Sequence, residues 1–386
     1  ELGSGHFKKA NNAKHTYLLK IYYPKKATSQ NANQGAAFSA HVEITSAKAP
    51  TVSTFAETIL AKNEVKTPIT TPGAAISTAD EALLASAEDD YGTSYYFRGA
   101  VTNNYVEFAN KCWRIVRVSG DGSVKLILHN DNTTGVANPC DAANNSASAA
   151  FARYSGETYK SAFNTNYNDN AYVGFKYGTV GAGDYALTHA NTNKSTILTN
   201  LEAWYEKNNL KNYEKVIADT VWCNDKTNVT DTSYDPWSIT PNGLGYAKNV
   251  TYYGATQRLV SSTSGSAGGT GLSLKCNGKL SKITSKIGLI TADELAFAGY
   301  AAGTTAGTGN TTTYLQENAT DTYWWSLSPG NFYGNSARVW IVGGSSGVFG
   351  HRSVGNTSAV RPSISLKSTT NVTGEGTSSS PYIISM

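Results

Sequence analysis

The fold is decided by residues 112–129, which read CWRIVRVSGDGSVKLILH. Two runs rich in β-branched and aliphatic side chains, 112–118 and 124–129, have the composition typical of strands. Between them, Gly120-Asp121-Gly122 supplies residues that accept the positive φ angles of a tight hairpin turn. We therefore predict a β-hairpin at this place.

Further strands are predicted on both sides of this hairpin. Two short runs upstream, 94–97 (SYYF) and 104–108 (NYVEF), extend it into a β-meander. Toward the C-terminus, Gly-, Ser- and Asn-rich loops separate four more predicted strands: 322–328 (TYWWSLS), 337–342 (ARVWIV), 347–350 (GVFG) and 360–366 (VRPSISL). The pattern predicts an α+β fold that is rich in strands and carries long loops.

Short helices are predicted where apolar residues recur at helical spacing or follow a capping box. Residues 196–205 place Ile197, Leu201, Trp204 and Tyr205 on one helix face. Other predicted helices are residues 54–60, a segment opened by a capping box at 78–81, residues 213–217, and a segment opened by a capping box at 291–294.

The composition is typical of an extracellular, strand-rich protein. Charged residues make up 16% of the 386 residues, below the ~25% of an average soluble domain. The chain has 24 Tyr and 36 Gly, which provide amphipathic rings and positive-φ turn positions. The net charge of +4 forms no block, so no nucleic acid is expected as a partner. No apolar run of about 18 residues occurs, so no transmembrane segment is predicted in this chain.

The chain has four cysteines, Cys112, Cys140, Cys223 and Cys276. None belongs to a C-x-x-C pair and no histidine cluster accompanies them, which disfavours a zinc site. We predict no metal. Two disulfides are expected, and the order along the chain favours Cys112–Cys140 and Cys223–Cys276, although three connectivities remain open. The alternative is four buried free thiols. The segment Trp222-Cys-Asn-Asp225 is interpreted as the neighbourhood of a disulfide.

Three regions are predicted along the chain. Residues 1–48 contain two strand patterns, 15–23 and 38–44, which cannot bury a core alone. They join a later domain, end a sandwich whose beginning is missing, or pair with another chain. Residues 49–90, punctuated by prolines, are expected to be a connector with short helices. Residues 91–386 are expected to form the main domain.

The N-terminal region resembles a known family. The runs LGSGHF, HTYLLKIYYP and QNANQGAAFSAHVEI are similar to the closing strands of the TasA/camelysin-type secreted β-sandwich. The resemblance covers about 45 residues and implies an extracellular Gram-positive protein, in some members a fibre subunit that donates a strand to its neighbour. The chain departs from the family because the first part of the sandwich is missing, so residues 1–48 are expected to form a partial β-sandwich.

The main domain resembles secreted Firmicutes proteins with a C-type-lectin-like core. The resemblance rests on SYYFRGAVTNNYVEFANKCWRIVR, LEAWYEKN, VIADTVWCND, IGLITADELAFAG, YWWSLSP and AVRPSISL, and it covers roughly residues 90–386. Related folds include the formylglycine-generating enzyme and the variable proteins diversified by retroelements. The resemblance implies a twisted sheet with long loops, in which the segment before a terminal V-R-P strand forms the ligand surface.

The candidate ligand surface is residues 330–358, which mix aromatic, small polar and basic residues. This is the composition of an adaptable recognition surface. The candidate ligand-binding residues are Asn331, Phe332, Tyr333, Asn335, Arg338, Trp340, Phe349, His351 and Arg352. Alternatively, Trp340 and Phe349 are core residues of alternating strands, whereas Arg338, His351 and Arg352 are expected to be exposed.

Three residues near this surface are interpreted as structural. Trp324 and Trp325 are neighbours in a predicted strand, so their rings point to opposite faces and at least one belongs to the core. Arg361, just before a proline, is expected to hold a loop through several hydrogen bonds.

The sequence favours binding over catalysis. No G-x-S-x-G elbow, phosphate loop or dinucleotide fingerprint is present. The formylglycine-generating activity needs reactive cysteines in its C-terminal cleft, and no cysteine follows Cys276. The calcium-site motifs of true lectins are not intact, and Asp89, Asp90 and Asp219 are isolated carboxylates. We therefore expect neither catalytic residues nor a cofactor.

The expected function is that of an extracellular, cell-surface or filament-associated protein. Its lectin-like domain would act as an adhesin that binds a glycan or protein ligand on another cell. The alternative is a structural subunit that self-assembles into a surface filament or pilus by strand complementation at residues 1–48. A third hypothesis is that retroelement mutagenesis diversifies residues 330–358.

Overall fold

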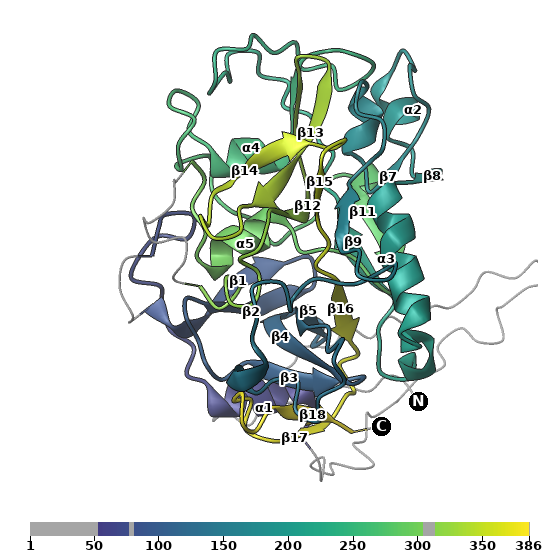
Figure 1. Ribbon diagram of the computed structural model, residues 1–386. Coiled ribbons are helices and arrows are strands. Elements are labelled where there is room, and N and C mark those ends of the chain that lie inside the picture. Colours follow the sequence, from purple (N-terminus) through teal and green to yellow (C-terminus); the bar gives the residue numbers. More distant parts are fainter. Residues whose placement is uncertain (1–52, 77–80, 304–312, 386) are drawn as a thin grey trace, which may run out of the picture. The chain divides into compact units, whose positions relative to one another are not determined.

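Two β-sheets form the frame of the folded region (Figure 1). The computed structural model describes residues 53–76, 81–303 and 313–385. The larger sheet has eight strands and the second has six, and two pairs of short strands lie beside them. Helices in the described residues are few and short. The predicted α+β, strand-rich fold class is therefore confirmed.

The predicted hairpin lies at the centre of the eight-stranded sheet. Its strands are β4 (Lys111–Val118) and β5 (Val124–Asn130), and Gly122 has a φ of 82° in the turn between them. Strands β2 and β3 pair with opposite ends of β4, while β5 continues to β16. The other strands are β1 (Leu83–Asp89), β2 (Gly92–Arg98), β3 (Tyr105–Phe108), β16 (Ser363–Leu366), β17 (Val372–Thr373) and β18 (Tyr382–Ile384). The four strands of the predicted meander are present, but they do not form a meander, because β2 and β3 both pair with β4 rather than with each other.

The six-stranded sheet carries the predicted ligand surface. Its central strand β12 (Trp324–Tyr333) pairs with β13 (Ser336–Val342), and β13 pairs in turn with β14 (Phe349–Ser353). Register shifts on both sides of Pro329 interrupt the β12–β13 ladder, as expected for a residue without an N–H. The remaining strands are β6 (Lys160–Ala162), β10 (Thr251–Tyr252) and β15 (Thr357–Ala359).

Two small ladders and five α-helices complete the elements of the described residues. The ladders join β9 (Thr220–Cys223) to β11 (Lys282–Ser285) and β7 (Lys176–Tyr177) to β8 (Asn193–Lys194). The α-helices are α1 (Phe55–Lys62), α2 (Tyr185–His189), α3 (Thr196–Lys207), α4 (Gly254–Leu259) and α5 (Ala292–Ala298). Single 3-10 turns are η3 (Ala142–Asn144), η4 (Asn170–Val173), η5 (Leu210–Tyr213) and η6 (Lys279–Ser281).

Three of the predicted helices are confirmed. In α1 and α5, the N-cap residues Thr54 and Thr291 each form a complete capping box with the glutamate three residues later. In α3, the side chain of Ser195 caps the first turn, and the predicted apolar face is buried. Local hydrogen bonding therefore sets where these helices begin.

Two helix predictions are wrong. Residues 83–89 form strand β1, which pairs with β2 along its whole length, because this pairing buries Leu84 and Ala85. The first three residues of the predicted capping box, 78–80, lie outside the described residues. At 213–217 no helix forms: the turn η5 ends at Tyr213, and Ile217 makes a β-bridge to Leu366. In both places sheet pairing outweighs the local helical pattern.

The folded region extends into the predicted connector, residues 49–90. Helix α1 buries Phe55 and Ile59, and the backbone N–H of Phe55 donates to Thr370 O at 2.7 Å. Strand β1 belongs to the eight-stranded sheet. The predicted domain boundary at residue 91 therefore moves toward the N-terminus. Residues 1–48, on which the partial-sandwich prediction rests, lie outside the described residues.

Aromatic side chains fill much of the core. Both Trp324 and Trp325 are fully buried, so the prediction that at least one is a core residue is confirmed. The Trp325 indole donates to Ser161 O at 2.8 Å, which ties β12 to β6. In the described part of the chain, no helix has the length and apolar character needed to cross a membrane.

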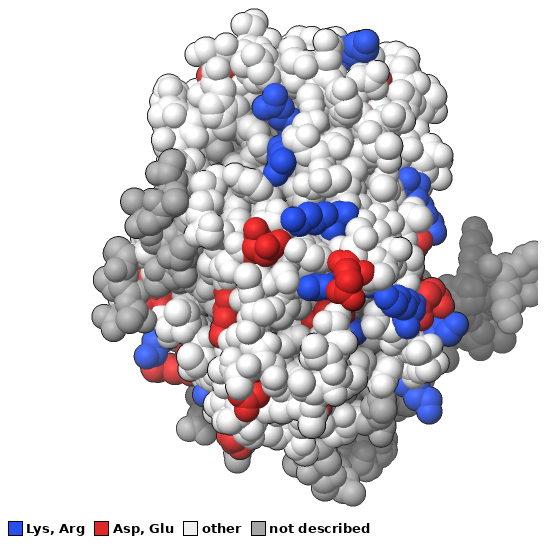
Figure 2. All heavy atoms as spheres, in the orientation of Figure 1, with Lys and Arg blue, Asp and Glu red and all other residues white. Residues whose placement is uncertain are grey.

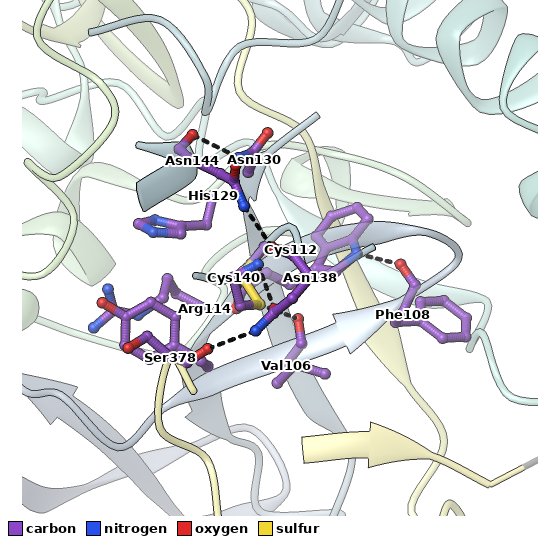
Figure 3. Close-up of a disulfide and its surroundings, with 12 residues drawn as sticks. Val106, Phe108, Cys112, Arg114, His129, Asn130, Asn138, Cys140, Asn144 and Ser378 are labelled. Atoms are coloured by element: carbon purple, nitrogen blue, oxygen red, sulfur yellow. Dashed lines mark hydrogen bonds between the residues drawn. A yellow bond between two sulfur atoms is a disulfide. The ribbon is translucent and has the colours of Figure 1, made fainter. Parts of the chain in front are cut away.

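Both predicted disulfides are present, Cys112–Cys140 and Cys223–Cys276 (Figure 3 shows the first). No free cysteine remains, so the alternative of buried thiols is wrong. The segment around Trp222 is a disulfide neighbourhood, as predicted. Two disulfides indicate a protein that folds in an oxidising, non-cytoplasmic compartment.

Candidate functional site

The predicted ligand-binding residues lie on strands β12–β14, where the sheet divides them between two faces. The ring of Trp340 packs against Phe349 at 4.8 Å and against His351 at 5.2 Å between centroids, so these three side chains share one face. Side chains alternate along a strand, so Arg352 points to the opposite face. There its guanidinium lies 4.8 Å from the ring centroid of Tyr323. The candidate residues therefore cannot form one contact surface.

Four of the candidates are core residues that expose almost no surface to a ligand. Asn331, Phe332 and Trp340 are each 1% exposed, and Phe349 is fully buried. Helix α4 packs on β12, and the Trp340 indole donates to the Thr256 hydroxyl of α4 at 3.2 Å. For Trp340 and Phe349, the alternative of core residues holds.

The remaining candidates reach the surface to different degrees. Tyr333 is 39% exposed, and Asn335, with a φ of 59°, is exposed in the tight turn between β12 and β13. Arg338, His351 and Arg352 are half-buried rather than exposed, because each packs against an aromatic ring. Tyr333, Arg338 and His351 belong to the same face of the sheet.

Trp237 completes this face from another part of the chain. It lies in an irregular loop before β10, and its half-buried ring meets that of His351 at 4.6 Å in an edge-to-face arrangement. The ring of Tyr252 supports it at 5.5 Å. We call Trp237, Asn331, Tyr333, Arg338 and His351 the aromatic face. Trp237 was absent from the predicted candidates, because its loop lies almost a hundred residues before β12 in the sequence.

Several polar groups of the aromatic face have no partner among the described residues. The Arg338 side chain makes no hydrogen bond or ion pair, and its guanidinium lies 5.5 Å from the Tyr333 ring centroid. The Asn331 Oδ1 and Arg338 Nε atoms are shielded from solvent and unpartnered. Buried polar atoms in native proteins usually find partners, so this place has unused hydrogen-bonding capacity.

His351 is neutral at physiological pH. Burial, together with the positive charge of Arg338, lowers the pKa of its imidazole to about 3. A neutral imidazole offers one donor and one acceptor. The aromatic face thus combines ring surfaces with a cationic fork and neutral hydrogen-bonding groups. The surface over β12–β14 in Figure 2 is mainly uncharged with isolated basic side chains, and acidic side chains gather over the lower half.

A second polar cluster lies where α5 meets β4 and β9. Glu294 binds Lys125 at 2.6 Å and Arg117 at 2.9 Å, and Arg117 also binds Asp89 at 2.7 Å. Nearby, Arg258 bridges Asp225 and Asp293, at 2.7 Å to each. These ion pairs line a cavity of about 40 Å³, which holds no more than a few water molecules.

This charged cluster is a structural network rather than a candidate active site. Each acid of the cluster is paired with a cation, so no carboxylate is left free to act as a base. Asp89 is occupied by Arg117. In the described ranges, no group of three or more His, Cys, Asp or Glu is placed to hold a metal ion.

In comparisons with known proteins, no family model, no curated protein and no solved structure matched the chain. The signals for this site were the composition of residues 330–358 and the resemblance of the main domain to lectin-like proteins. These signals drew attention to β12–β14, but they could neither separate the two faces of the sheet nor bring Trp237 to His351.

Proposed function

We propose that this chain is an extracellular binding protein of adhesin type that recognises a glycan on another cell through the aromatic face. In this proposal it acts by binding and not by catalysis. The observation that carries the proposal is the edge-to-face pair of Trp237 and His351, 4.6 Å apart, beside the unpaired side chain of Arg338.

The chemistry of the face fits a saccharide. The apolar faces of sugar rings pack on aromatic side chains, whose large area costs little conformational entropy on binding. Neutral His351 can exchange hydrogen bonds with hydroxyl groups. The guanidinium of Arg338 can bind an acidic group of the ligand bidentately or donate a single hydrogen bond to a hydroxyl group. The disulfides agree with exposure to an extracellular ligand.

A glycan array with the full chain tests this proposal. Trp237→Ala and Arg338→Ala should each weaken binding of the best glycan at least about tenfold, as expected for central anchor residues. Arg352→Ala is the matched control, because Arg352 is also half-buried and has no hydrogen bond or ion pair among the described residues, but it lies on the opposite face of the sheet. It should leave binding unchanged.

Two results would overturn the proposal. Wild-type protein that binds no glycan would remove the ligand class, and a protein array would then test the protein ligand. Equal binding by all three variants would remove the aromatic face. The filament alternative stays a prediction, because it rests on residues 1–48. Light scattering and electron microscopy of the full chain would detect filaments.

A further inference from the structure

A second place in the molecule has the form of a small polar pocket. The loop that follows β5 encloses a hollow of about 220 Å³. Asn130, Asn132, Thr133 and Thr134 form one side of it, and residues 143–146 with Arg153 form the other. The hollow is separate from the aromatic face in sequence and shares no residue with it.

The walls of this hollow are fixed without a ligand. The disulfide Cys112–Cys140 anchors the loop to β4 (Figure 3). The Asn130 amide donates to Asn144 O at 3.1 Å, and the Asn144 amide donates to Asn138 O at 2.8 Å. Such bonds hold the two sides together, so little ordering entropy would be lost on binding.

Asn132 shapes the floor of the loop. It adopts a φ of 50°, in the left-handed region that asparagine tolerates better than most residues. Its Oδ1 accepts a hydrogen bond from the Val136 N–H at 2.9 Å, and its amide donates to Asn110 O at 3.0 Å. The Asn132 side chain therefore forms hydrogen bonds within the loop and is not available to a ligand.

The free groups of the hollow are hydroxyls and one amide oxygen. The hydroxyls of Thr133, Thr134 and Ser146 make no hydrogen bond within the described residues, and all three residues are exposed. Arg153 is the only charged residue in the lining. Its terminal nitrogens already donate to Ser148 and to Phe151 O, whereas its Nε is shielded and unpartnered.

From this geometry we propose that the hollow binds a neutral monosaccharide unit through its hydroxyl groups. No carboxylate lines it, which disfavours a cation. Both terminal nitrogens of Arg153 already donate within its own loop, which leaves few donors for an anion. Polar walls disfavour an apolar ligand. Pockets for drug-sized molecules measure about 300–1,000 Å³, so a hollow of about 220 Å³ suits a single sugar ring.

Saturation-transfer NMR on the full, disulfide-bonded chain tests the proposal. The probes are methyl glucoside, methyl galactoside, methyl mannoside and N-acetylglucosamine, each offered alone. At least one should receive saturation from the wild-type protein. Ala143→Trp places a bulky ring at the lining and should abolish the signal. Ala142→Trp is the matched control, because Ala142 is exposed on the same turn η3 but does not line the hollow.

The outcomes are distinguishable from those of the glycan array. A signal that survives in Ala143→Trp, or no signal from any probe with wild-type protein, overturns the proposal and leaves a hollow filled by water. A signal that disappears in Trp237→Ala but persists in Ala143→Trp assigns the sugar to the aromatic face instead. Thermal unfolding of both tryptophan variants should match wild type, because both positions are exposed.

Discussion

Arg361 shows what a single side chain does in this fold. It is 1% exposed and carries no ion pair in the described residues. Its Nε donates to Leu128 O at 2.9 Å and its Nη1 to Leu315 O at 2.5 Å, so it holds β5 to the segment before β12. Burial lowers the pKa of the guanidinium to about 10, which still leaves it charged at neutral pH. The prediction of a loop-holding arginine is confirmed.

Arg361→Lys should destabilise the protein by about 2–4 kcal/mol, because an ammonium cannot reach both carbonyl oxygens and an unsatisfied buried group costs about 1–3 kcal/mol. Denaturant unfolding measures the loss. Arg352→Lys is the control, because Arg352 makes no hydrogen bond in the described residues, and it should change stability by less than about 0.5 kcal/mol. Equal stability of the two variants would contradict the structural role of Arg361.

At the scale of elements, Glu294 joins helix α5 to the eight-stranded sheet. One carboxylate oxygen accepts from the Thr291 N–H at 2.9 Å, which completes the capping box. The other binds Lys125 of β5 and Arg117 of β4. Burial pushes the pKa of Glu294 upward, but the two cations outweigh burial and lower it to about 2.

Glu294→Gln should lower the free energy of unfolding at pH 7 by about 3–5 kcal/mol, because it leaves two buried cations without their carboxylate. The folded-state pKa lies below the ordinary value of 4.5, so the folded state binds fewer protons than the unfolded state between these values. The stabilisation by Glu294 is therefore present above pH 4.5 and is lost as the pH falls toward 2.

Denaturant titrations at several pH values between 7 and 3 check this prediction. The wild type should lose stability below pH 4.5 more steeply than the Glu294→Gln variant. Glu206→Gln is the control, since the pair of Glu206 and Lys211 is exposed and such pairs contribute about 0–1 kcal/mol. Parallel pH profiles for wild type and Glu294→Gln would show that the network does not depend on this carboxylate.

At the scale of the whole folded region, its two ends meet. Strand β18 lies between its parallel neighbour β3 and β17, which ends the eight-stranded sheet. The ring of Tyr382 in β18 packs edge-to-face on Phe55 of α1 at 5.2 Å between centroids. Lys62, at the end of α1, binds Glu375 at 2.7 Å. Helix α1 and the C-terminal strands thus close the same part of the core.

Tyr382→Ala should destabilise the protein by about 3–5 kcal/mol, the usual cost of removing a large buried aromatic side chain. The adjacent Ile383 is 41% exposed, whereas Tyr382 is fully buried, so Ile383→Ala should cost less than about 1 kcal/mol. Hydrogen exchange should speed up in α1 of the Tyr382 variant, because both elements share this contact. Unchanged exchange in α1 would show that the two ends are not coupled.

Features that depend on neighbouring residues could be predicted from the amino-acid sequence alone. The Gly-Asp-Gly turn between β4 and β5 needs only local backbone freedom, and the capping boxes at Thr54 and Thr291 need only a glutamate three residues later. The disulfide pairing favoured by chain order was confirmed. The turn and the caps join residues that are close in sequence, so composition and spacing were sufficient to predict them. The disulfide partners lie 28 and 53 residues apart, and chain order only favoured their pairing.

Features that depend on residues distant in sequence could be assigned only from the folded structure. Residues 83–89 became a strand because β2 offers them a pairing edge. Among the predicted contact residues, packing of α4 and the alternation of side chains along the strands decided which are buried and which are exposed. Trp237 reached His351 through loops that no local pattern specifies. Burial is a property of the whole packed chain, and therefore residue type alone could indicate the segment but could not predict which side chains lie together at its surface.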